Sequence, residues 1–534
     1  MKQIKKQLLI LLVAGIMLAM ATACGKSDAD TGEEPNAGNN AWQNAISNAE
    51  PSEGLSFAFT DERDAYIVVG MGSCRDVDLV IPASYNGLPV TEIGKNAFQY
   101  DYTLMSVIIP DSVTSIGDSA FERCSNLKRV ILPDSVTSIG ENAFHLCKDM
   151  TDITLSGSVT SIGKEAFSYC ESLTSITIPD SVTSIGDEVF QGCKGLKSID
   201  IGSGVTSIGS EAFNWCTSLT NITIPGSVTS IGDEAFYGAG LTSITIENGV
   251  TSIGKEAFKS CSGLTSITLP GSVASIGNNA FEDCSSLTSI TIENGVTSIG
   301  SYAFYKCTSL AGITVPDSVT SIGEYAFREC TSLTSIDIGN GVTSIGDDTF
   351  RGCSSLTDIA LGSSVTSIGA FAFQNCTNLV SITFPDSVND IGYLAFDGCT
   401  GLTSVTLGKG FTSIDNYAFK GCSALTGITF PDSVTSIGDE AFYNCASLES
   451  ITIPDGVTSI GDDSFWSCEN LTSITLPNSV TSIGASAFFW CTNLTSFNYA
   501  GTMAEWEAIE KGWLWDSAAA FETIHCTDGD ITLY

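Results

Sequence analysis

The side chains best suited to chemistry in this chain of 534 residues are its 19 cysteines. Closely spaced cysteines can bind zinc, hold an iron–sulfur cluster or form disulfide bonds. Sixteen of them, from Cys124 to Cys491, recur every 23 residues with one gap at Ala239, and none forms a C-x-x-C pair. This spacing does not support a metal site, and a column of equivalent cysteines gives each one two equal neighbours. We therefore expect small, buried, reduced thiols.

Acid–base and nucleophilic chemistry lack the residues that they need. The chain has two histidines, His145 and His525, and 17 steps at the strand spacing of about 4.8 Å would separate them by roughly 80 Å. Adjacent carboxylates such as Asp187-Glu188 recur with the repeat, whereas a catalytic pair would be unique and partly buried. The recurrent glycines form no phosphate-binding loop. We expect no catalytic residues, no cofactor and no metal, so an enzyme is the least favoured class.

The elements that position these residues are copies of one repeat. The stretch 171–193, ESLTSITIPDSVTSIGDEVFQGC, is copied from about residue 93 to residue 495, and all 18 slots from Phe98 to Phe488 hold phenylalanine. A period of 20–29 residues with apolar residues at fixed offsets is typical of a leucine-rich-repeat solenoid. We expect an array of about 18 repeats of 23 residues over 93–495, in which stacking builds one continuous core.

The residue type at each position of the repeat follows from this stacking. Ile176 and Ile178 alternate with hydroxyl side chains, as in a strand with one buried face. The slot of Gly186 is glycine in 17 of 18 copies, with Asp415 as the exception, so we expect a positive φ or a close backbone approach there. The residue before phenylalanine is alanine in 15 copies, which lets the ring stack flat between neighbouring coils.

The run LxxIxIPxxVxxIGxxAFxxC resembles the BspA-type leucine-rich repeat of bacterial surface proteins, over roughly 400 residues. The resemblance implies a right-handed parallel β solenoid with short helical or 3-10 segments, displayed on a bacterial surface. Members of that family are associated with attachment to host matrix proteins and to other cells. The resemblance therefore implies that this protein is an adhesin or docking scaffold for a protein partner on host matrix or neighbouring cells.

Residues 1–23 are expected to be a signal peptide, because lysines precede an apolar run that is too short to span a bilayer. The string Ala21-Thr22-Ala23 fits ordinary signal peptidase. Together with Cys24 it also resembles the bacterial lipoprotein box, with Ala21 in place of the usual leucine. Both interpretations cleave before Cys24, and we favour lipid attachment at Cys24 over plain secretion. The protein is then exported and anchored at the cell surface.

The segments around the array are expected to serve it. Residues 24–53 have almost no apolar content and form a disordered acidic tether with a reach of roughly 30 Å. Residues 54–92 read as an N-terminal cap with strands at 66–69 and 79–82. Residues 496–534 read as a C-terminal cap with a short helical segment, in which Trp506 shares a face with Ile509, followed by a hairpin.

The array has one irregularity in its period. Between Phe236 and Leu241 one residue is missing, which predicts a tighter loop or a hinge.

Lysine and arginine total 22 against 60 acidic residues, a net charge of −38. Nucleic acid and anionic membrane surfaces are therefore poor partners, and membrane contact is expected only through the N-terminal lipid. Solubility of a monomeric stacked array is the simplest reason for the acidity.

The alternative to an adhesin is a passive structural or ice-type surface. The serine and threonine columns at 175/177, 266/268 and 289/291 would form a flat hydroxyl ladder. The same columns follow from β propensity on a solvent-facing sheet. A perfectly regular face would favour the structural alternative, and irregular aromatic positions favour the adhesin.

The variable columns flank the phenylalanine slot, and in the second half of the array they are rich in aromatic residues. Coil stacking predicts that these side chains form an aromatic ridge that binds the partner. The alternative is that the rings only pack on each other between coils. The ridge comprises Tyr302, Tyr305, Tyr325, Phe371, Tyr393, Tyr417, Tyr443, Trp466, Phe489 and Trp490.

Overall fold

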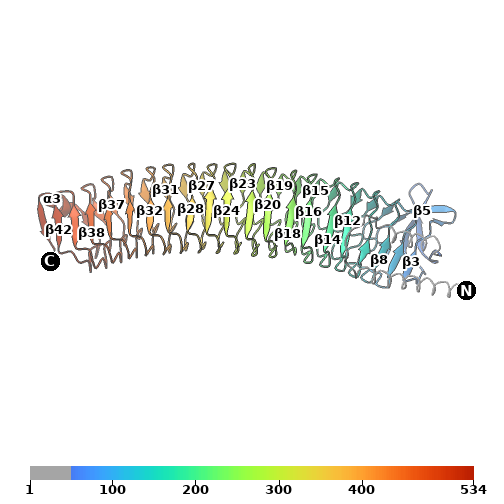
Figure 1. The fold of residues 1–534 in the computed structure, drawn as a ribbon. Coiled ribbons are helices and arrows are strands. Elements are labelled where there is room, and N and C mark those ends of the chain that lie inside the picture. The colour runs from blue at the N-terminus through green and yellow to red at the C-terminus, as the bar shows by residue number, and fades with distance from the viewer. Residues whose placement is uncertain (1–49, 534) are drawn as a thin grey trace, which may run out of the picture.

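The computed structural model describes residues 50–533, and these form a long, gently curved rod (Figure 1). It is a parallel β solenoid of about 20 turns with almost no helix, which confirms the expected fold class. Consecutive coils lie side by side in sequence order, so the two ends of the described chain lie at opposite ends of the rod (Figure 1). The signal peptide 1–23, Cys24 and the tether up to residue 49 lie outside the described residues.

Each coil contributes a longer strand in which buried and exposed residues alternate. In β12 (Ser175–Ile178) the isoleucines are buried and the hydroxyl side chains are exposed, and the strand pairs with β14 in parallel register, Ser175 opposite Ser198. Such alternation is the mark of a sheet with one face on the core. These strands are β6 (Ser106–Ile108), β8 (Arg129–Ile131), β10 (Asp152–Ile153), β12 (Ser175–Ile178), β14 (Ser198–Ile201), β16 (Asn221–Ile224), β18 (Ser243–Ile246), β20 (Ser266–Leu269), β22 (Ser289–Ile292), β24 (Gly312–Val315), β26 (Ser335–Ile338), β28 (Asp358–Ala360), β30 (Ser381–Thr383), β32 (Ser404–Thr406), β34 (Gly427–Thr429), β36 (Ser450–Thr452), β38 (Ser473–Leu476) and β40 (Ser496–Tyr499).

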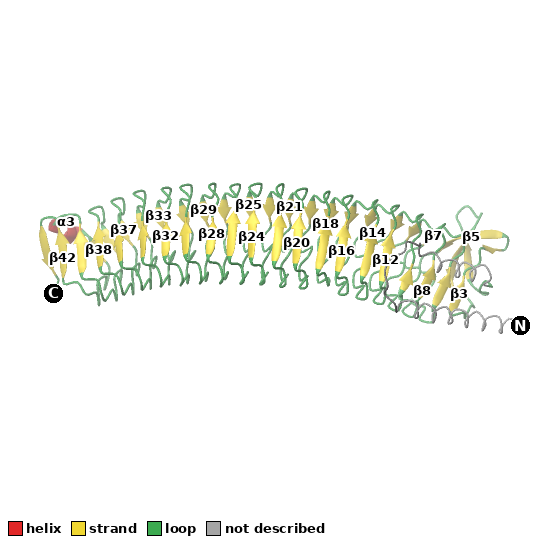
Figure 2. Cartoon of the chain, viewed as in Figure 1, coloured by secondary structure: helices red, strands yellow, loops and turns green. Residues whose placement is uncertain are grey.

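A second, two-residue strand follows in each coil and forms its own ladder (Figure 2). In β7 to β39 the strand ends on the unbroken isoleucine of the repeat, which is buried, whereas β41 ends on Lys511. Loops connect the two ladders along the edges of the rod (Figure 2). These strands are β7 (Ser115–Ile116), β9 (Ser138–Ile139), β11 (Ser161–Ile162), β13 (Ser184–Ile185), β15 (Ser207–Ile208), β17 (Ser230–Ile231), β19 (Ser252–Ile253), β21 (Ser275–Ile276), β23 (Ser298–Ile299), β25 (Ser321–Ile322), β27 (Ser344–Ile345), β29 (Ser367–Ile368), β31 (Asp390–Ile391), β33 (Ser413–Ile414), β35 (Ser436–Ile437), β37 (Ser459–Ile460), β39 (Ser482–Ile483) and β41 (Glu510–Lys511).

The phenylalanine column forms the spine of the core. From Phe98 to Phe488 each ring is buried and stacks on the next, with centroids 4.9–5.7 Å apart and ring planes within 19° of parallel. The predicted flat stacking is therefore confirmed. The small residue before each phenylalanine makes this spacing possible, because a larger side chain would separate the coils.

The glycine slot of the repeat is explained by the close approach of the preceding coil's backbone and not by a positive φ. A Cβ at Gly140 would lie 2.6 Å from the backbone nitrogen of Asp118, and one at Gly209 would lie 2.6 Å from that of Asp187. No glycine of this slot has a left-handed φ among the described residues. Of the two alternatives that we expected, a positive φ or a close backbone approach, the structure therefore confirms the close approach.

The short-strand ladder is interrupted at three places: between β11 and β13, between β25 and β27, and between β31 and β33. In the first two, a β-branched residue occupies the small slot of the following coil, Val189 or Thr349. There the glycine is no longer crowded, since the nearest atoms to a Cβ at Gly186 or Gly346 would lie 3.6 Å away. The third coil carries Asp415 in the glycine slot itself. Each interruption therefore coincides with a β-branched residue in the small slot or with Asp415 in the glycine slot.

The N-terminal end of the array is covered by a sheet of its own. Antiparallel β1 (Ser56–Phe59) and β2 (Tyr66–Gly70) extend the short-strand ladder through β5 (Leu88–Ile93), with β4 (Ser84–Tyr85) beside it. On the other ladder, β3 (Asp78–Val80) pairs with β6. The Ser52 backbone N–H donates to the Val80 carbonyl at 2.9 Å, so the chain covers the open edge of β3.

The C-terminal end is closed by one helix and a hairpin. Helix α3 (Met503–Ala508) begins at a capping box formed by Thr502 and Glu505. It buries Trp506 and the adjacent Ile509, as the sequence pattern predicted. Strands β42 (Thr523–Cys526) and β43 (Gly529–Thr532) then pair antiparallel. This is the only helix in residues 50–533; in the array, the short helical or 3-10 segments that the resemblance implied are turns.

The missing residue between Phe236 and Leu241 does not interrupt the stack. Phe236 stacks at 5.1 Å on Phe213 and at 5.3 Å on Phe258, and β16 pairs in register with β18 across this coil. The coil therefore contains the tighter loop of the two alternatives, within an unbroken core. Within residues 50–533, no helix is long and apolar enough to cross a membrane.

Candidate functional site

The predicted ridge residues lie in the six-residue turn around each phenylalanine. The residues two before and two after it have left-handed φ angles, as at Tyr302 (58°) and Lys306 (58°) around Phe304. The turns are bonded from coil to coil: the Tyr302 N–H donates to the Glu324 carbonyl at 3.0 Å, and the Phe304 N–H to the Ala326 carbonyl at 2.8 Å. Equivalent side chains of neighbouring coils are therefore fixed beside each other in columns.

The first part of the ridge is a cluster of three tyrosines with Arg328 and with Lys306, whose Nζ lies 5.0 Å from the centre of the Tyr305 ring. The rings of Tyr302 and Tyr325 stack at 4.4 Å, and Tyr305 meets Tyr302 edge-on at 5.7 Å. The guanidinium of Arg328 lies 5.5 Å from the centre of the Tyr325 ring and 6.0 Å from that of Tyr305. This arrangement is a cation–π cluster on the surface of two adjacent coils.

The coil around Phe350 has no aromatic residue in these columns, and charged side chains link the rings of the coils on either side of it. Asp348 is buried and forms ion pairs with Arg328 at 3.5 Å and with Arg351 at 2.9 Å. Arg351 in turn lies 5.5 Å from the centre of the Phe371 ring. A buried carboxylate needs such partners. The two arginines therefore continue the row between Tyr325 and Phe371.

Beyond Phe371 the row continues to the last coil. Phe371 meets Tyr393 at 5.6 Å, and Tyr393 meets Tyr417 at 5.1 Å. Lys420 Nζ lies 5.0 Å from the centre of the Tyr417 ring and 4.8 Å from that of Tyr443. Burial alone would lower the pKa of Lys420, but the hydrogen bond to Glu440 and the charges of Glu440 and Asp397 together outweigh burial and raise the pKa, so the cation is retained.

The last coils complete the row with tryptophan and phenylalanine. Tyr443 meets Trp466 edge-on at 4.5 Å, Trp466 meets Phe489 at 5.8 Å, and Phe489 meets Trp490 at 5.6 Å. The structure thus brings all ten predicted residues into one row, linked by direct ring contacts and three interleaved cations. The rings do pack on each other, as the alternative interpretation required. None of them is fully buried, and Tyr393 and Trp490 are 45% and 51% exposed.

Sequence reasoning did not identify the cations that link the rings of neighbouring coils, Arg328, Arg351 and Lys420. All three occupy the slot directly after phenylalanine, which holds Tyr305, Tyr443, Trp466 and Phe489 in other coils. The signal was therefore present in the repeat register. It could have been found by considering cations and rings of one column together, because a cation over a ring face is attracted to it.

The cysteine column lies inside the array and has a hydrogen-bonding role that the sequence did not reveal. Each of its 16 thiols donates to the carbonyl of the phenylalanine in the preceding coil at 3.1–3.3 Å, as Cys307 does to Phe281. All are buried free thiols. Burial raises the pKa of Cys193, for example, to about 12.

The other residues capable of chemistry stay apart. His145 lies within the array, 3.8 Å from Glu165, and burial lowers its pKa. His525 lies in the C-terminal hairpin, 3.0 Å from Asp530. Within residues 50–533 no group of three or more histidine, cysteine or acidic side chains is placed to hold a metal ion. In the described part of the chain the two histidines therefore lie apart, each beside one acidic side chain.

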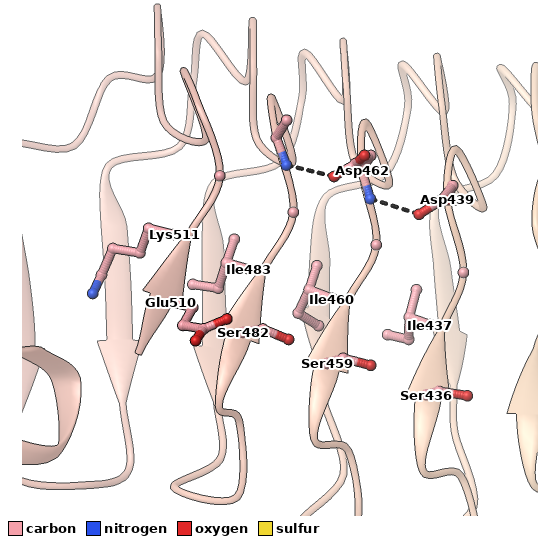
Figure 3. A pocket seen from close by; sticks show the side chains of 15 residues that line it. Ser436, Ile437, Asp439, Ser459, Ile460, Asp462, Ser482, Ile483, Glu510 and Lys511 are labelled. Carbon is pink, nitrogen blue, oxygen red and sulfur yellow. Dashed lines mark hydrogen bonds between the residues drawn. The ribbon is translucent and has the colours of Figure 1, made fainter. Parts of the chain in front are cut away.

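The surface hollows of the rod are shallow and lie along its two strand ladders. One, of about 600 Å³, runs along β35, β37 and β39 and ends at Glu510 and Lys511 (Figure 3). Above these strands the Asp439 carboxylate accepts a hydrogen bond from the Asp462 N–H at 2.8 Å, and Asp462 accepts one from the Ala485 N–H (Figure 3). These aspartates are used in bonding one coil to the next, so the hollow contains no free acidic group from that column.

A stack of parallel coils with leucine, isoleucine and phenylalanine columns defines a leucine-rich-repeat solenoid protein. The family model for the BspA type leucine rich repeat region matches residues 91–217, 184–311, 275–403 and 394–509. These ranges span most of the chain. The chain therefore belongs to the BspA-type leucine-rich repeat family, which confirms the resemblance.

Several solved structures are similar to this chain. A leucine-rich repeat protein from Bacteroides ovatus is 29% identical, with 88% of this chain and 98% of that chain covered and a TM-score of 0.44. A leucine rich cell surface protein from Faecalibacterium prausnitzii is 25% identical (87% and 98% covered, TM-score 0.30). The pneumococcal vaccine antigen PcpA is 17% identical (88% and 97% covered, TM-score 0.31). No curated protein sequence matches the chain.

Proposed function

We propose that this protein is an exported cell-surface binding protein, an adhesin or docking scaffold that holds a protein partner on its aromatic ridge. The observation that carries the proposal is the row itself: ten partly exposed aromatic side chains and three cations in direct contact along the second half of the rod. Tyrosine, tryptophan and arginine dominate binding hot spots, because they combine a large contact area with a polar end.

The ridge is suited to a partner because its side chains are held in place before binding. Each ring is fixed by its neighbours and by the hydrogen-bonded turn beneath it, so little conformational entropy remains to be lost on association. The family membership and the cell-surface description of the Faecalibacterium relative support the same proposal. We propose that the protein acts as a monomer and catalyses no reaction.

The passive structural alternative finds less support in the sheet of longer strands. Its outward columns are irregular, because Asp200, Gly312, Asp337 and Ala360 replace the usual serine or threonine. A lattice-matching surface would need an unbroken hydroxyl array. The irregular face favours the adhesin.

For the whole chain we propose five segments. These are a signal peptide 1–23, a tether 24–53 that begins with lipidated Cys24, an N-terminal cap 54–92, the array 93–495 and a C-terminal cap 496–534. Mass spectrometry of the N-terminal peptide tests the anchor: a diacylglycerol thioether on Cys24 is expected. An unmodified Cys24 in protein recovered from culture medium would instead establish plain secretion.

The ridge is tested by replacing Tyr393, Tyr417, Tyr443 and Trp466 together by serine in the full-length chain. Cells that display the wild type should adhere to a host-matrix or bacterial surface, and the quadruple variant should lose this adhesion. The matched control replaces two exposed aromatic residues outside the ridge, Tyr102 and Trp513, by serine. Retained adhesion of the quadruple variant, with an unchanged circular dichroism melting curve, would refute the ridge proposal.

A further inference from the structure

The first half of the array carries a different side chain in the slot two residues before phenylalanine. Five consecutive coils hold glutamate there, and we call this row the glutamate column: Glu165, Glu188, Glu211, Glu234 and Glu256. All five side chains are partly exposed. Because the coils stack in register, neighbouring carboxylates of this column are separated by about one strand spacing, ~5 Å. Like charges at this separation repel each other.

The two ends of the glutamate column are neutralised and its centre is not. Lys164 Nζ lies 2.9 Å from Glu188, and Lys255 Nζ lies 3.1 Å from Glu256. Within residues 50–533, neither Glu211 nor Glu234 has an ion pair with a lysine or arginine. Burial, and next the charges of Glu211 and Glu256, raise the pKa of Glu234.

A buried polar group beside these carboxylates lacks a donor. Asn214 is only 5% exposed, and its Nδ2 donates to Glu211 at 3.1 Å. Its Oδ1 has no hydrogen-bond partner in the described part of the chain. A buried acceptor without a donor is costly, of order 1–3 kcal/mol. The group that it lacks is an N–H or O–H donor.

An exposed aromatic ring stands next to Asn214. Trp215 is 51% exposed, and its indole meets the Tyr237 ring at 5.7 Å. The ring lies over Gly238, where a Cβ would come within 3.1 Å of it. Gly238 has a φ of +62° and begins the Gly-Ala-Gly loop of the one 22-residue coil. The glycine at this slot therefore provides the room in which this indole lies.

We propose that Glu211, Glu234, Asn214 and Trp215 form a binding site for an arginine side chain of a basic protein segment. A guanidinium carries five donors and no acceptor, so it can bond to both carboxylates and supply the donor that Asn214 lacks. Its planar face stacks on an indole better than an ammonium does. Glu188 and Glu256, which are paired with Lys164 and Lys255, lie on either side of this site. This site lies outside the aromatic ridge and does not depend on the ridge's function.

The probe for this site is a fluorescently labelled octa-arginine peptide, with octa-lysine as its comparison. The full-length wild type should bind octa-arginine more tightly than octa-lysine at an ionic strength of about 0.15 M, where the screening length is about 8 Å, measured by fluorescence anisotropy. Glu211→Gln together with Glu234→Gln should weaken octa-arginine binding roughly tenfold or more, because two charge-assisted bonds are lost. Trp215→Ala should remove the preference for arginine over lysine.

The matched control changes the same number of charges elsewhere: Asp337→Asn with Asp358→Asn on the sheet of longer strands. It should leave octa-arginine binding within about twofold, since charges at a distance are screened. Equal weakening by the control pair would show general attraction to an acidic protein and overturn the proposal, as would a wild type that does not bind octa-arginine. The quadruple ridge variant should bind octa-arginine normally, so the two proposals can fail independently.

Discussion

At the scale of single residues, the thiol column shows how one side chain can serve both packing and hydrogen bonding. Each thiol fills a buried position and donates to a phenylalanine carbonyl, as Cys193 does to Phe167 at 3.1 Å. That carbonyl also accepts the N–H of its own coil's cysteine, as Phe167 accepts from Cys170 at 3.1 Å. The thiolate would have to form without water and beside this carbonyl, which explains why burial raises the pKa of Cys193 to about 12.

Alkylation should therefore distinguish Cys526 from the array cysteines. Iodoacetamide at pH 8 should label Cys526, which is only partly buried, and leave the 16 array thiols and buried Cys74 unmodified in the native protein. Reactivity requires the thiolate, and at this pH the array thiols remain protonated and shielded from solvent. Peptide mapping by mass spectrometry gives the modified positions.

Two controls complete this test. Denaturation in guanidinium chloride should make all the array thiols reactive, which shows that they were reduced and protected by the fold. A Cys526→Ser variant should show no labelling in residues 50–533 of the native protein. Extensive oxidation of the array cysteines before denaturation would mean that the buried-thiol interpretation is wrong.

At the scale of elements, the short-strand ladder shows how one slot controls the contact between coils. In a regular coil the glycine N–H donates to the isoleucine carbonyl of the preceding coil, as Gly438 does to Ile414 at 2.9 Å. Asp415 lies where the ladder between β31 and β33 is interrupted, because its Cβ and carboxylate do not fit against the neighbouring backbone. Burial, and next the charge of Asp390, raise the pKa of Asp415.

Replacing Asp415 by glycine should restore the ladder at this coil. We expect the free energy of unfolding at pH 7 to rise by about 1 kcal/mol, from a recovered backbone hydrogen bond and the removal of a partly buried carboxylate. Urea unfolding followed by circular dichroism gives the change, and hydrogen exchange should show new protection of the residue 415 amide. The reverse change in a regular coil, Gly438→Asp, should destabilise the protein.

The stability gain of Asp415→Gly should depend on pH in a definite direction. An acid whose pKa is raised in the folded state holds more protons there, so stability falls as pH rises from the unfolded to the folded pKa. The advantage of Asp415→Gly over the wild type should therefore be larger at pH 7 than near pH 3. Asp415→Asn, which removes the charge and keeps the Cβ, separates the two effects. An equal gain from asparagine would assign the interruption to charge alone.

At the scale of the whole molecule, the fold makes a rod whose length is set by the number of coils. Eighteen repeat slots in register, at about 4.8 Å each, give a long axis of at least roughly 80 Å. The net charge of −38 is spread along this rod. Repulsion between copies should keep the protein monomeric, since no basic half offsets the acidity.

Small-angle scattering should therefore give the profile of a single elongated particle, with a maximum dimension above roughly 80 Å. Light scattering after size exclusion should give the mass of one chain at both low and physiological salt. Lower ionic strength should not promote association, because screening is then weaker. A compact particle would contradict the stacked array, and a dimer at low salt would contradict the monomer.

The sequence by itself determined the period, the coil and the core of this protein. Ile176, Ile178 and Phe190 recur at offsets that only stacked coils can bury, so the repeat predicts the solenoid without reference to contacts between coils. It also placed the aromatic ridge, because residues in one slot must align when coils stack. These features depend on spacing along the chain, which the sequence states directly.

Only the tertiary structure decided how neighbouring coils meet. It placed the left-handed φ angles on both sides of phenylalanine and not at glycine, and it gave the thiols their carbonyl acceptors. It also showed that Val189, Thr349 and Asp415 interrupt the ladder and that Arg328, Arg351 and Lys420 link the rings. The physical reason is that these features arise from contacts between residues about one repeat apart. Their geometry depends on side-chain direction and on shifts of a few tenths of an ångström, which the spacing of residue types does not specify.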